Sequence, residues 1–285
     1  MSRMFGTDGV RGIANSHELS PELAYRLGRA GAYLLTQEAT AQGQGRPRLV
    51  IGMDTRASGE MLEAALVAGI CSVGVDAVRV GVVTTPAVAF LISALQAQGG
   101  VMISASHNPA EYNGIKFFSA SGYKLPDAVE DQLEDLVRSE EDTLPRPTGG
   151  AVGRAVDRPD AAEAYVAHVV STVAAEDGDR PWQGLKIVVD CANGASYRLA
   201  PEVYRRLGAE VIVMADSPDG VNINVHCGST HPEGMQEAVR RHGAHLGIAH
   251  DGDADRVILA DEKGELVDGD HVLALCGLHL LRAGK

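Results

Sequence analysis

The chain alternates short apolar strands with helical stripes, and it does so twice. The first series opens with a strand at residues 48–54 and ends with an apolar strand at 101–103, and the second runs from a strand at 185–190 to one near residue 250. Strands that alternate with helices indicate parallel sheets with right-handed crossovers. Because both series open with a strand that ends in Asp, they suggest two copies of one unit. We therefore expect an α/β fold made of two similar α/β domains, with mixed, mainly parallel sheets flanked by helices.

The segments outside the two series set the expected domain boundaries. Residues 143–153 hold two Pro and three Gly, which is typical of a linker. We expect a serine-loop domain at 1–152, a metal-loop domain at 153–257, and the first elements of a third domain at 258–285. That last segment has the pattern of a hairpin followed by a helix at 272–281, which is apolar almost all round and suits burial on most sides. With 285 residues and 45% hydrophobic content, the chain is long enough for two cores.

Charge and cysteine usage exclude several classes of partner and location. The chain carries 38 acidic against 25 basic residues, a net charge of −13, without a Lys/Arg run. Nucleic acid and anionic membranes are not expected partners, because they require a concentrated basic stripe. The four Cys have no Cys-x-x-Cys spacing, the start lacks an apolar signal segment, and no stretch approaches the ~20 apolar residues of a membrane span. We expect free thiols and a cytoplasmic location.

A polar loop follows the strand at 101–103. Its sequence is Ser104-Ala105-Ser106-His107-Asn108-Pro109, and we call residues 104–109 the serine loop. The loop presents a hydroxyl at a strand's carboxyl end, where open α/β sheets bind their ligands. Two interpretations are open: Ser106 is a nucleophile with His107 as an adjacent base, or the polar side chains cap one another's backbone in a turn. Ser104 is the rival nucleophile, since strand alternation points it to the same side as Ser106.

Three carboxylates stand within five residues at Asp251, Asp253 and Asp255, and we call residues 251–256 the metal loop. Such carboxylates repel one another unless a cation or solvent screens them, and hard oxygen ligands suit Mg²⁺ or Ca²⁺. A solvated acidic turn and a calcium EF-hand are the alternatives. Arg256 argues against the EF-hand because it stands where that loop requires Gly.

The two loops occupy equivalent positions in the two copies, so we expect Ser106 to meet the acidic cluster across a cleft. A hydroxyl, a metal site and Arg256 together suggest phosphoryl transfer. Arg256 would then neutralise phosphate or only pair with the acids.

Three segments resemble signature sequences of the α-D-phosphohexomutases. They are Phe-Gly-Thr-Asp-Gly-Val-Arg-Gly at residues 5–12, the serine loop and the metal loop, and they occur in that order along nearly the whole chain. The serine loop and residues 222–230 are most similar to members of the family that act on glucosamine phosphates. The resemblance implies an intramolecular phosphotransferase that interconverts glucosamine 6-phosphate and glucosamine 1-phosphate through a phosphoserine and a bisphosphorylated sugar, in the supply of amino-sugar nucleotides and cell-wall precursors.

The resemblance also implies roles for single residues. Ser106 would carry the phosphate and, with Asp251, Asp253 and Asp255, ligate one Mg²⁺ per chain. Lys116 matches a proton-transfer position, and Arg11 and His107 match positions near the transferring phosphate; the alternatives are a surface lysine and a turn-stabilising histidine. Residues 54–59 also resemble family sequence, and we interpret them as structural, with Ser58 capping the next helix.

Other functions stay open at this point. Phosphohexomutases of this kind have four domains, and the loops of the third and fourth that select the sugar and bind the substrate's own phosphate are not found in this sequence, so the chain alone is expected to be inactive or weakly active. The alternatives are a phosphomannomutase or phosphoglucomutase, a metal-dependent phosphatase with Asp251 and Asp253 as an Asp-x-Asp nucleophile pair, or a catalytically incomplete fragment that binds Mg²⁺. A homodimer is a further option.

Overall fold

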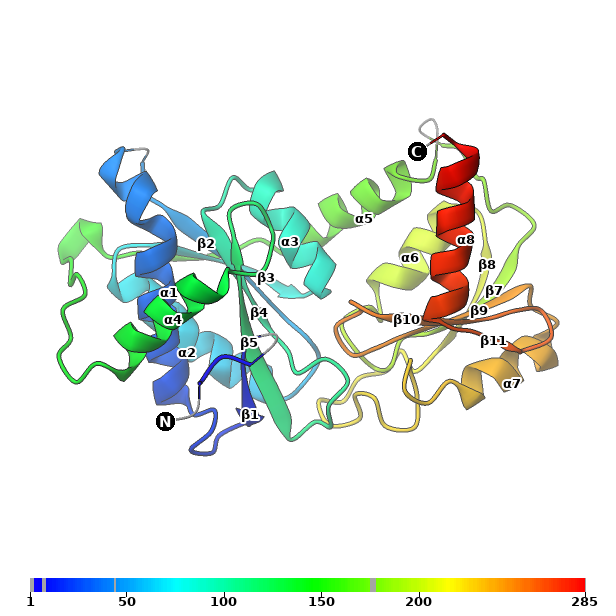
Figure 1. Ribbon diagram of the computed structural model, residues 1–285, viewed down its shortest axis with the longest axis horizontal. Coiled ribbons are helices and arrows are strands. Elements are labelled where there is room, and N and C mark those ends of the chain that lie inside the picture. Colours follow the sequence, from blue (N-terminus) through cyan, green and yellow to red (C-terminus); the bar gives the residue numbers. More distant parts are fainter. Residues whose placement is uncertain (1–2, 7–8, 44, 175–177, 285) are drawn as a thin grey trace.

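The computed structural model describes residues 3–6, 9–43, 45–174 and 178–284. Within these ranges the chain forms two α/β units that lie next to each other along the long axis of the molecule (Figure 1). The predicted fold class is confirmed: each unit has a mixed sheet, and helices flank it.

The first sheet has six strands in the order β1-β5-β4-β2-β3-β6. The parallel strands β2, β3, β4 and β6 form one side of the sheet. Next to β4 lies β5, which is antiparallel to it, and β1 pairs antiparallel with β5 at the edge. The bounds are β1 Val10–Ile13, β2 Arg48–Met53, β3 Asp76–Val82, β4 Gly99–Ile103, β5 Tyr112–Ser119 and β6 Ala155–Asp157.

Four helices accompany this sheet: α1 Pro21–Ala41, α2 Ser58–Ser72, α3 Thr85–Ala94 and α4 Asp127–Arg138. Ser20 caps α1, its Oγ accepting a hydrogen bond from the Leu23 N–H at 3.2 Å. The cap of α3 is Thr84, so the side chain of the next residue, Thr85, is available for a contact outside the helix. One core cluster packs α1, α2 and α4 on one face of the sheet, and another packs α3 on the other face.

The second sheet has five strands in the order β11-β10-β9-β7-β8. Its elements are α5 Ala161–Ser171, β7 Lys186–Asp190, α6 Leu199–Arg206, β8 Glu210–Met214, α7 Glu233–His242, β9 Leu246–His250, β10 Val257–Ala260, β11 Leu266–Val267 and α8 Gly269–Arg282; a short 3-10 turn, η1, covers Gly149–Ala151. The run β3-β2-β4-β5 in the first sheet corresponds to β8-β7-β9-β10 in the second, with the same parallel and antiparallel pairings. The predicted repeat is therefore visible in the strand order.

The two units pack against each other through apolar side chains. The core cluster around α3 also contains Val166 of α5 and Leu199, Val203 and Leu207 on or next to α6. Since one cluster draws residues from both units, its burial favours a fixed arrangement of the two sheets.

Three segments lie differently from what their patterns suggested. β6 pairs with β3 in the first sheet, beyond the boundary expected at residue 152, and β10 and β11 complete the second sheet although 258–285 was expected to begin a third domain. The apolar helix α8 is exposed, with Leu273 and Leu281 each at 72%. An apolar pattern indicates that a helix favours burial, but burial also requires other residues that pack against it. The described residues do not pack over α8.

Two expectations about the whole chain can be compared with the structure. Cys71, Cys191, Cys227 and Cys276 are all free thiols, as predicted. Within the described ranges, none of the helices combines the length and the apolar character that crossing a bilayer requires.

Candidate active site

The serine loop turns sharply at Ser106, immediately after β4. Ser106 adopts a left-handed backbone with φ of 54°, and its N–H donates to Ser104 Oγ at 2.9 Å. Ser104 Oγ in turn donates to Asp54 Oδ2 at 2.6 Å, and Ser104 is fully buried. The turn breaks the strand alternation that would have pointed the two serines to the same side. The Ser104 hydroxyl is therefore buried in hydrogen bonds beneath the loop, while the Ser106 hydroxyl faces the second domain.

Asp54 and Arg56 form a buried pair under this loop. The guanidinium contacts the Asp54 carboxylate, and its Nη2 donates to the carbonyls of Ser106 at 3.0 Å and Asn108 at 2.6 Å. Burial raises the pKa of Asp54, and the Arg56 charge opposes that rise. The structural role predicted for residues 54–59 is therefore to support the serine loop from below, through Asp54 and Arg56. The expected cap is wrong, because Ser58 Oγ instead accepts a hydrogen bond from Asn113 Nδ2 at 2.9 Å.

The metal loop follows β9 in the second sheet. Asp251 and Asp253 are fully buried, whereas the Asp255 side chain is 33% exposed. Asp251 Oδ1 accepts a hydrogen bond from the Arg256 N–H at 3.1 Å, which ties the two ends of the loop together. One carboxylate oxygen from each of the three Asp residues lies within 4.8 Å of the others. Because the element before the loop is the strand β9 and not a helix, the EF-hand alternative is wrong.

The donor set of the metal loop suits a hard divalent cation. Asp253 Oδ1 is buried and has no hydrogen-bond partner among the described residues, while its Oδ2 accepts from Lys116 Nζ at 2.8 Å and from Thr85 Oγ1 at 2.7 Å. Burial favours the neutral acid, yet Lys116 and Thr85 lower the pKa of Asp253 and keep it ionised. Burial and the neighbouring Asp253 raise the pKa of Asp255 to about 6. Crowded carboxylates with one unused buried oxygen are what an oxygen-coordinated Mg²⁺ would relieve.

The two loops meet at Ser106 and Asp251. The Ser106 hydroxyl donates to Asp251 Oδ2 at 2.6 Å, and Arg256 Nη2 donates both to Ser106 Oγ at 2.5 Å and to Asp251 Oδ2 at 3.0 Å. The predicted meeting of hydroxyl and acidic cluster is therefore present, although the two residues are 145 positions apart.

His107 lies at the exposed edge of this contact. Its Nδ1 is 3.5 Å from Ser106 Oγ and also contacts Arg256 Nη2. Burial, together with the charges of Arg256 and Arg11, lowers the pKa of His107 and so favours the neutral imidazole. A neutral ring can accept a hydrogen bond from the guanidinium. His107 can therefore hold Arg256 in position, in addition to any direct role beside the Ser106 hydroxyl.

The predicted cations differ in how closely they approach the cluster. Lys116 on β5 is buried, and its Nζ lies 2.8 Å from Asp253 and 3.6 Å from Asp255, so the surface-lysine alternative is wrong. Arg256 is half exposed and pairs with Asp251 and Asp255. Arg11 is exposed on β1, opposite Gly114, and acts on the site through its charge near His107. Thr7 and Asp8 of the first motif lie outside the described residues.

Two contacts between the domains carry residues for which no role was predicted. Thr85, from the first domain, donates to the Asp253 carboxylate, and Asn224, from the second, donates through Nδ2 to the carbonyls of Ser106 at 3.0 Å and Asn108 at 3.3 Å. The serine loop thus accepts hydrogen bonds from a side chain of the second domain, and the metal loop accepts one from a side chain of the first domain. Asn224 stood in a stretch of family resemblance, but no local pattern indicates either partner.

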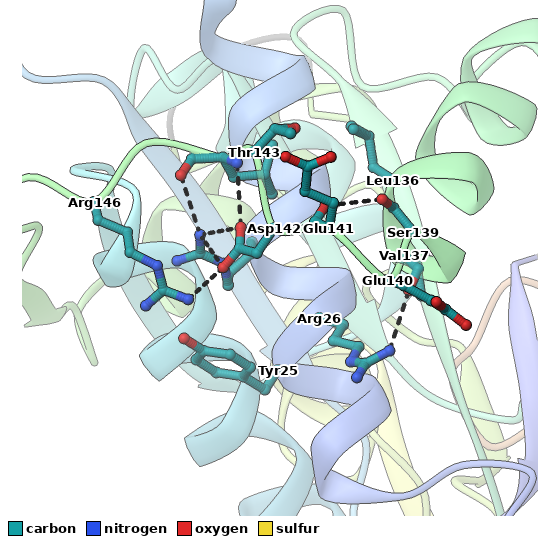
Figure 2. Close-up of a pocket in the computed structure, with 12 residues that line it drawn as sticks. Tyr25, Arg26, Leu136, Val137, Ser139, Glu140, Glu141, Asp142, Thr143 and Arg146 are labelled. Atoms are coloured by element: carbon teal, nitrogen blue, oxygen red, sulfur yellow. Dashed lines mark hydrogen bonds and ion pairs between the residues drawn. The ribbon is translucent and has the colours of Figure 1, made fainter.

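Another pocket lies on the first domain, away from these motifs. It has a volume of about 240 Å³ and is lined by α1 and the segment after α4, including Tyr25, Arg26 and Glu141 (Figure 2). Arg29 at this pocket is buried and already bound by Asp142 at 2.9 Å and Ser72 at 2.7 Å. Its charge is already matched within the protein. The crossing of the serine and metal loops, where a hydroxyl, three carboxylates and two cations converge, is therefore taken as the candidate active site.

Comparison with known proteins gives a consistent family. Residues 2–144 match the phosphoglucomutase/phosphomannomutase α/β/α domain I, and residues 163–264 match α/β/α domain II. Phosphoglucosamine mutases from Symbiobacterium thermophilum and Desulforudis audaxviator are 62% and 60% identical to the chain over 285 residues. The chain is fully covered in both comparisons and spans 62% and 61% of those relatives' lengths.

A solved structure agrees with this at the level of the fold. The crystal structure of a phosphoglucomutase/phosphomannomutase family protein from Burkholderia thailandensis superposes with a TM-score of 0.80 at 28% identity, over 99% of this chain and 59% of that one. Two family domains matched over most of the sequence confirm the predicted resemblance, and the chain belongs to the phosphoglucomutase/phosphomannomutase family.

Proposed function

We propose that this chain is the N-terminal portion of a phosphoglucosamine mutase, in which Ser106 carries the transferred phosphoryl group. The observation that carries the proposal is the 2.6 Å hydrogen bond from Ser106 Oγ to Asp251, which joins the ends of two strands in different domains. The identity of about 60% with phosphoglucosamine mutases supports glucosamine phosphates as substrates.

In the proposed reaction two phosphoryl groups each move once, one from Ser106 to the sugar and the other from the sugar to Ser106, and the protein is unchanged at the end. The bond from phosphorus to Ser106 Oγ breaks as a new bond forms to the free C1 hydroxyl oxygen of glucosamine 6-phosphate, giving a 1,6-bisphosphate. The proton of that hydroxyl passes to a base of the site and then to Ser106 Oγ. In the second half the bisphosphate has turned over: the bond from phosphorus to the C6 oxygen breaks as a bond forms to Ser106 Oγ, the Ser106 proton passes through the same base to the C6 oxygen, and glucosamine 1-phosphate leaves.

The residues around Ser106 have distinct roles in this proposal. Lys116 transfers the proton: released from its ion pairs with Asp253 and Asp255, and after losing a proton to solvent, its amine accepts the proton of the attacking hydroxyl and then gives it to Ser106 Oγ. Arg256 already donates to Ser106 Oγ and neutralises charge on the phosphoryl oxygens, with Arg11 and His107 adding donors at the open side. Asp251, Asp253, Asp255 and a phosphoserine oxygen would hold one Mg²⁺, which would supply further charge neutralisation when bound.

An aspartate-nucleophile phosphatase is less well supported. Asp251 accepts hydrogen bonds from Ser106 Oγ, from Arg256 Nη2 and from the Arg256 N–H, so both of its oxygens are engaged. That interpretation also gives the serine loop no task. The sugar preference over mannose and glucose phosphates rests on the relatives and not on a residue of this site.

The test is a mutase assay on two proteins. The 285-residue chain is compared with a chimaera that continues into the corresponding C-terminal residues of the Symbiobacterium thermophilum relative. We expect the chimaera to convert glucosamine 6-phosphate to glucosamine 1-phosphate, to lose this activity in Ser106→Ala, and to exceed the 285-residue chain by a wide margin. Conversion that survives Ser106→Ala, or release of inorganic phosphate instead of the isomer, would refute the proposal.

A further inference from the structure

Asn224 belongs to the second domain but its side chain binds the first. It lies in the connection between β8 and α7, and Nδ2 donates to the carbonyls of Ser106 and Asn108 in the serine loop. Its own backbone is held from its own domain: the Asn224 N–H donates to the Ala192 carbonyl at 2.9 Å, and φ is 61°. Because the backbone of Asn224 is held by the second domain and its side chain binds the serine loop, Asn224 couples the position of the second domain to the conformation of that loop.

The Ser106 turn needs such outside support. A residue with a Cβ pays about 1–2 kcal/mol in the left-handed region, so the turn persists only when its surroundings impose it. The two carbonyls that Asn224 binds belong to Ser106 and Asn108, one on each side of His107. Fixing both directions fixes the peptide planes of the turn and hence the direction in which Ser106 Oγ points.

Two donors share these carbonyls, and they differ in origin. Arg56 is anchored on Asp54 within the first domain, so its hydrogen bonds do not require the second domain. The hydrogen bonds of Asn224 exist only when the two domains are docked. The docking is close here, because a Cβ added to Gly252 of the metal loop would lie 2.5 Å from the Ser106 carbonyl oxygen and 2.9 Å from Asn224 Nδ2.

We propose that Asn224 is a positioning residue for the phosphoryl-carrying serine. Through it the second domain completes the Ser106 turn, so that the hydroxyl points at Asp251 only in the docked arrangement. This inference rests on the function proposed above and adds to it a residue that acts through the serine-loop backbone and not on the substrate.

The experiment uses three variants, each made in the chimaera with the C-terminal residues of the Symbiobacterium thermophilum relative, because the 285-residue chain alone is expected to be inactive or weakly active. Asn224→Asp keeps the shape but replaces the donor with a carboxylate that faces two carbonyl oxygens. Asn224→Gly removes the side chain while tolerating φ of 61° without strain. Asn222→Ala is the matched control, because among the residues that the structure describes the Asn222 side chain bonds within its own loop, accepting from the Asp219 N–H at 3.1 Å and donating to the Ser217 carbonyl at 3.0 Å.

Three readouts are taken from each protein: the rate of phosphoryl incorporation from glucose 1,6-bisphosphate, the Mg²⁺ affinity by calorimetry, and amide hydrogen exchange in the serine loop. We expect incorporation to slow about 10- to 100-fold in both Asn224 variants, since a displacement near 1 Å costs about this much. Serine-loop exchange should rise in the same two variants, while Mg²⁺ affinity stays at the wild-type value and Asn222→Ala behaves as wild type.

The outcomes separate this inference from the proposed function. Asn224 variants that incorporate phosphate at the wild-type rate would overturn the positioning role, as would a loss of Mg²⁺ affinity that matches the loss of rate. If the wild-type chimaera incorporates nothing, the proposed function loses its support, and serine-loop exchange then decides alone: faster exchange in the Asn224 variants than in Asn222→Ala supports positioning, and equal exchange refutes it.

Discussion

Replacing Arg56 with Met should destabilise the first domain far more than the same change at Arg206. The Arg56 side chain and the Asp54 carboxylate it contacts are both fully buried. Met retains most of the side-chain volume but leaves Asp54 with the Ser104 hydroxyl and a backbone N–H, and it removes one of two donors from the carbonyls of Ser106 and Asn108. Breaking a buried ion pair in this way costs about 3–5 kcal/mol. Because burial raises the pKa of Asp54, proton uptake by this carboxyl should hold the loss near the lower end of that range.

The control is Arg206→Met, which removes a pair with Glu163 and Glu202 at the surface. The Arg206 side chain is 35% exposed, and such pairs contribute less than about 1 kcal/mol. A double variant, Asp54→Asn with Arg56→Met, should recover about half of the loss because no charge remains buried.

Unfolding in urea is followed by circular dichroism, since the single Trp, Trp182, lies in the second domain and its fluorescence would report on that domain. A loss below about 1 kcal/mol in Arg56→Met, or a double variant no more stable than the single one, would refute the view that this pair supports the serine loop.

Three further predictions address the metal loop and the contact between the domains. Thr85→Val removes a donor from Asp253 and should weaken Mg²⁺ binding about 10-fold in calorimetry; an unchanged dissociation constant would show that Thr85 does not orient this ligand. The pKa of Asp255 is raised to about 6, so protons compete with the metal below that pH, and Mg²⁺ affinity should fall more steeply on acidification in the wild type than in Asp255→Asn. Gly252→Ala places a Cβ 2.5 Å from the Ser106 carbonyl and should cost about 1–3 kcal/mol of unfolding free energy, whereas Gly269→Ala, with open space around it, should be close to neutral; equal effects would contradict the close docking of the loops.

The sequence predicted the elements that carry strong apolar patterns. β4 and β9 are nearly continuous apolar runs, and each ends in a cluster of polar residues, so both the strands and the loops after them could be identified. The repeat of strand and helix then placed the two loops at equivalent sheet positions. All three residues of the edge strand β6 are exposed and show no apolar pattern, which explains why no strand was expected there and why these residues were placed in the second domain.

Contacts between distant parts of the chain could not be predicted in the same way. The Thr85 bond to Asp253 and the Asn224 bonds to the serine loop join residues more than 100 positions apart, and they depend on how the two domains dock. The left-handed turn at Ser106 is also a tertiary result, since Ser has no local preference for it. Likewise, the apolar sequence of α8 indicated a need for burial but not whether the rest of the chain meets it.

The most direct test of the account is the location of phosphate on this chain. The chimaera that contains this chain is incubated with glucose 1,6-bisphosphate and Mg²⁺, its intact mass is measured before and after phosphatase treatment, and the modified peptide is sequenced. The account predicts one phosphoryl group on Ser106, absent from Ser106→Ala and retained in Ser104→Ala. Phosphate on Ser104 or on Asp251, in a protein whose Ser106 stays unmodified, would contradict it.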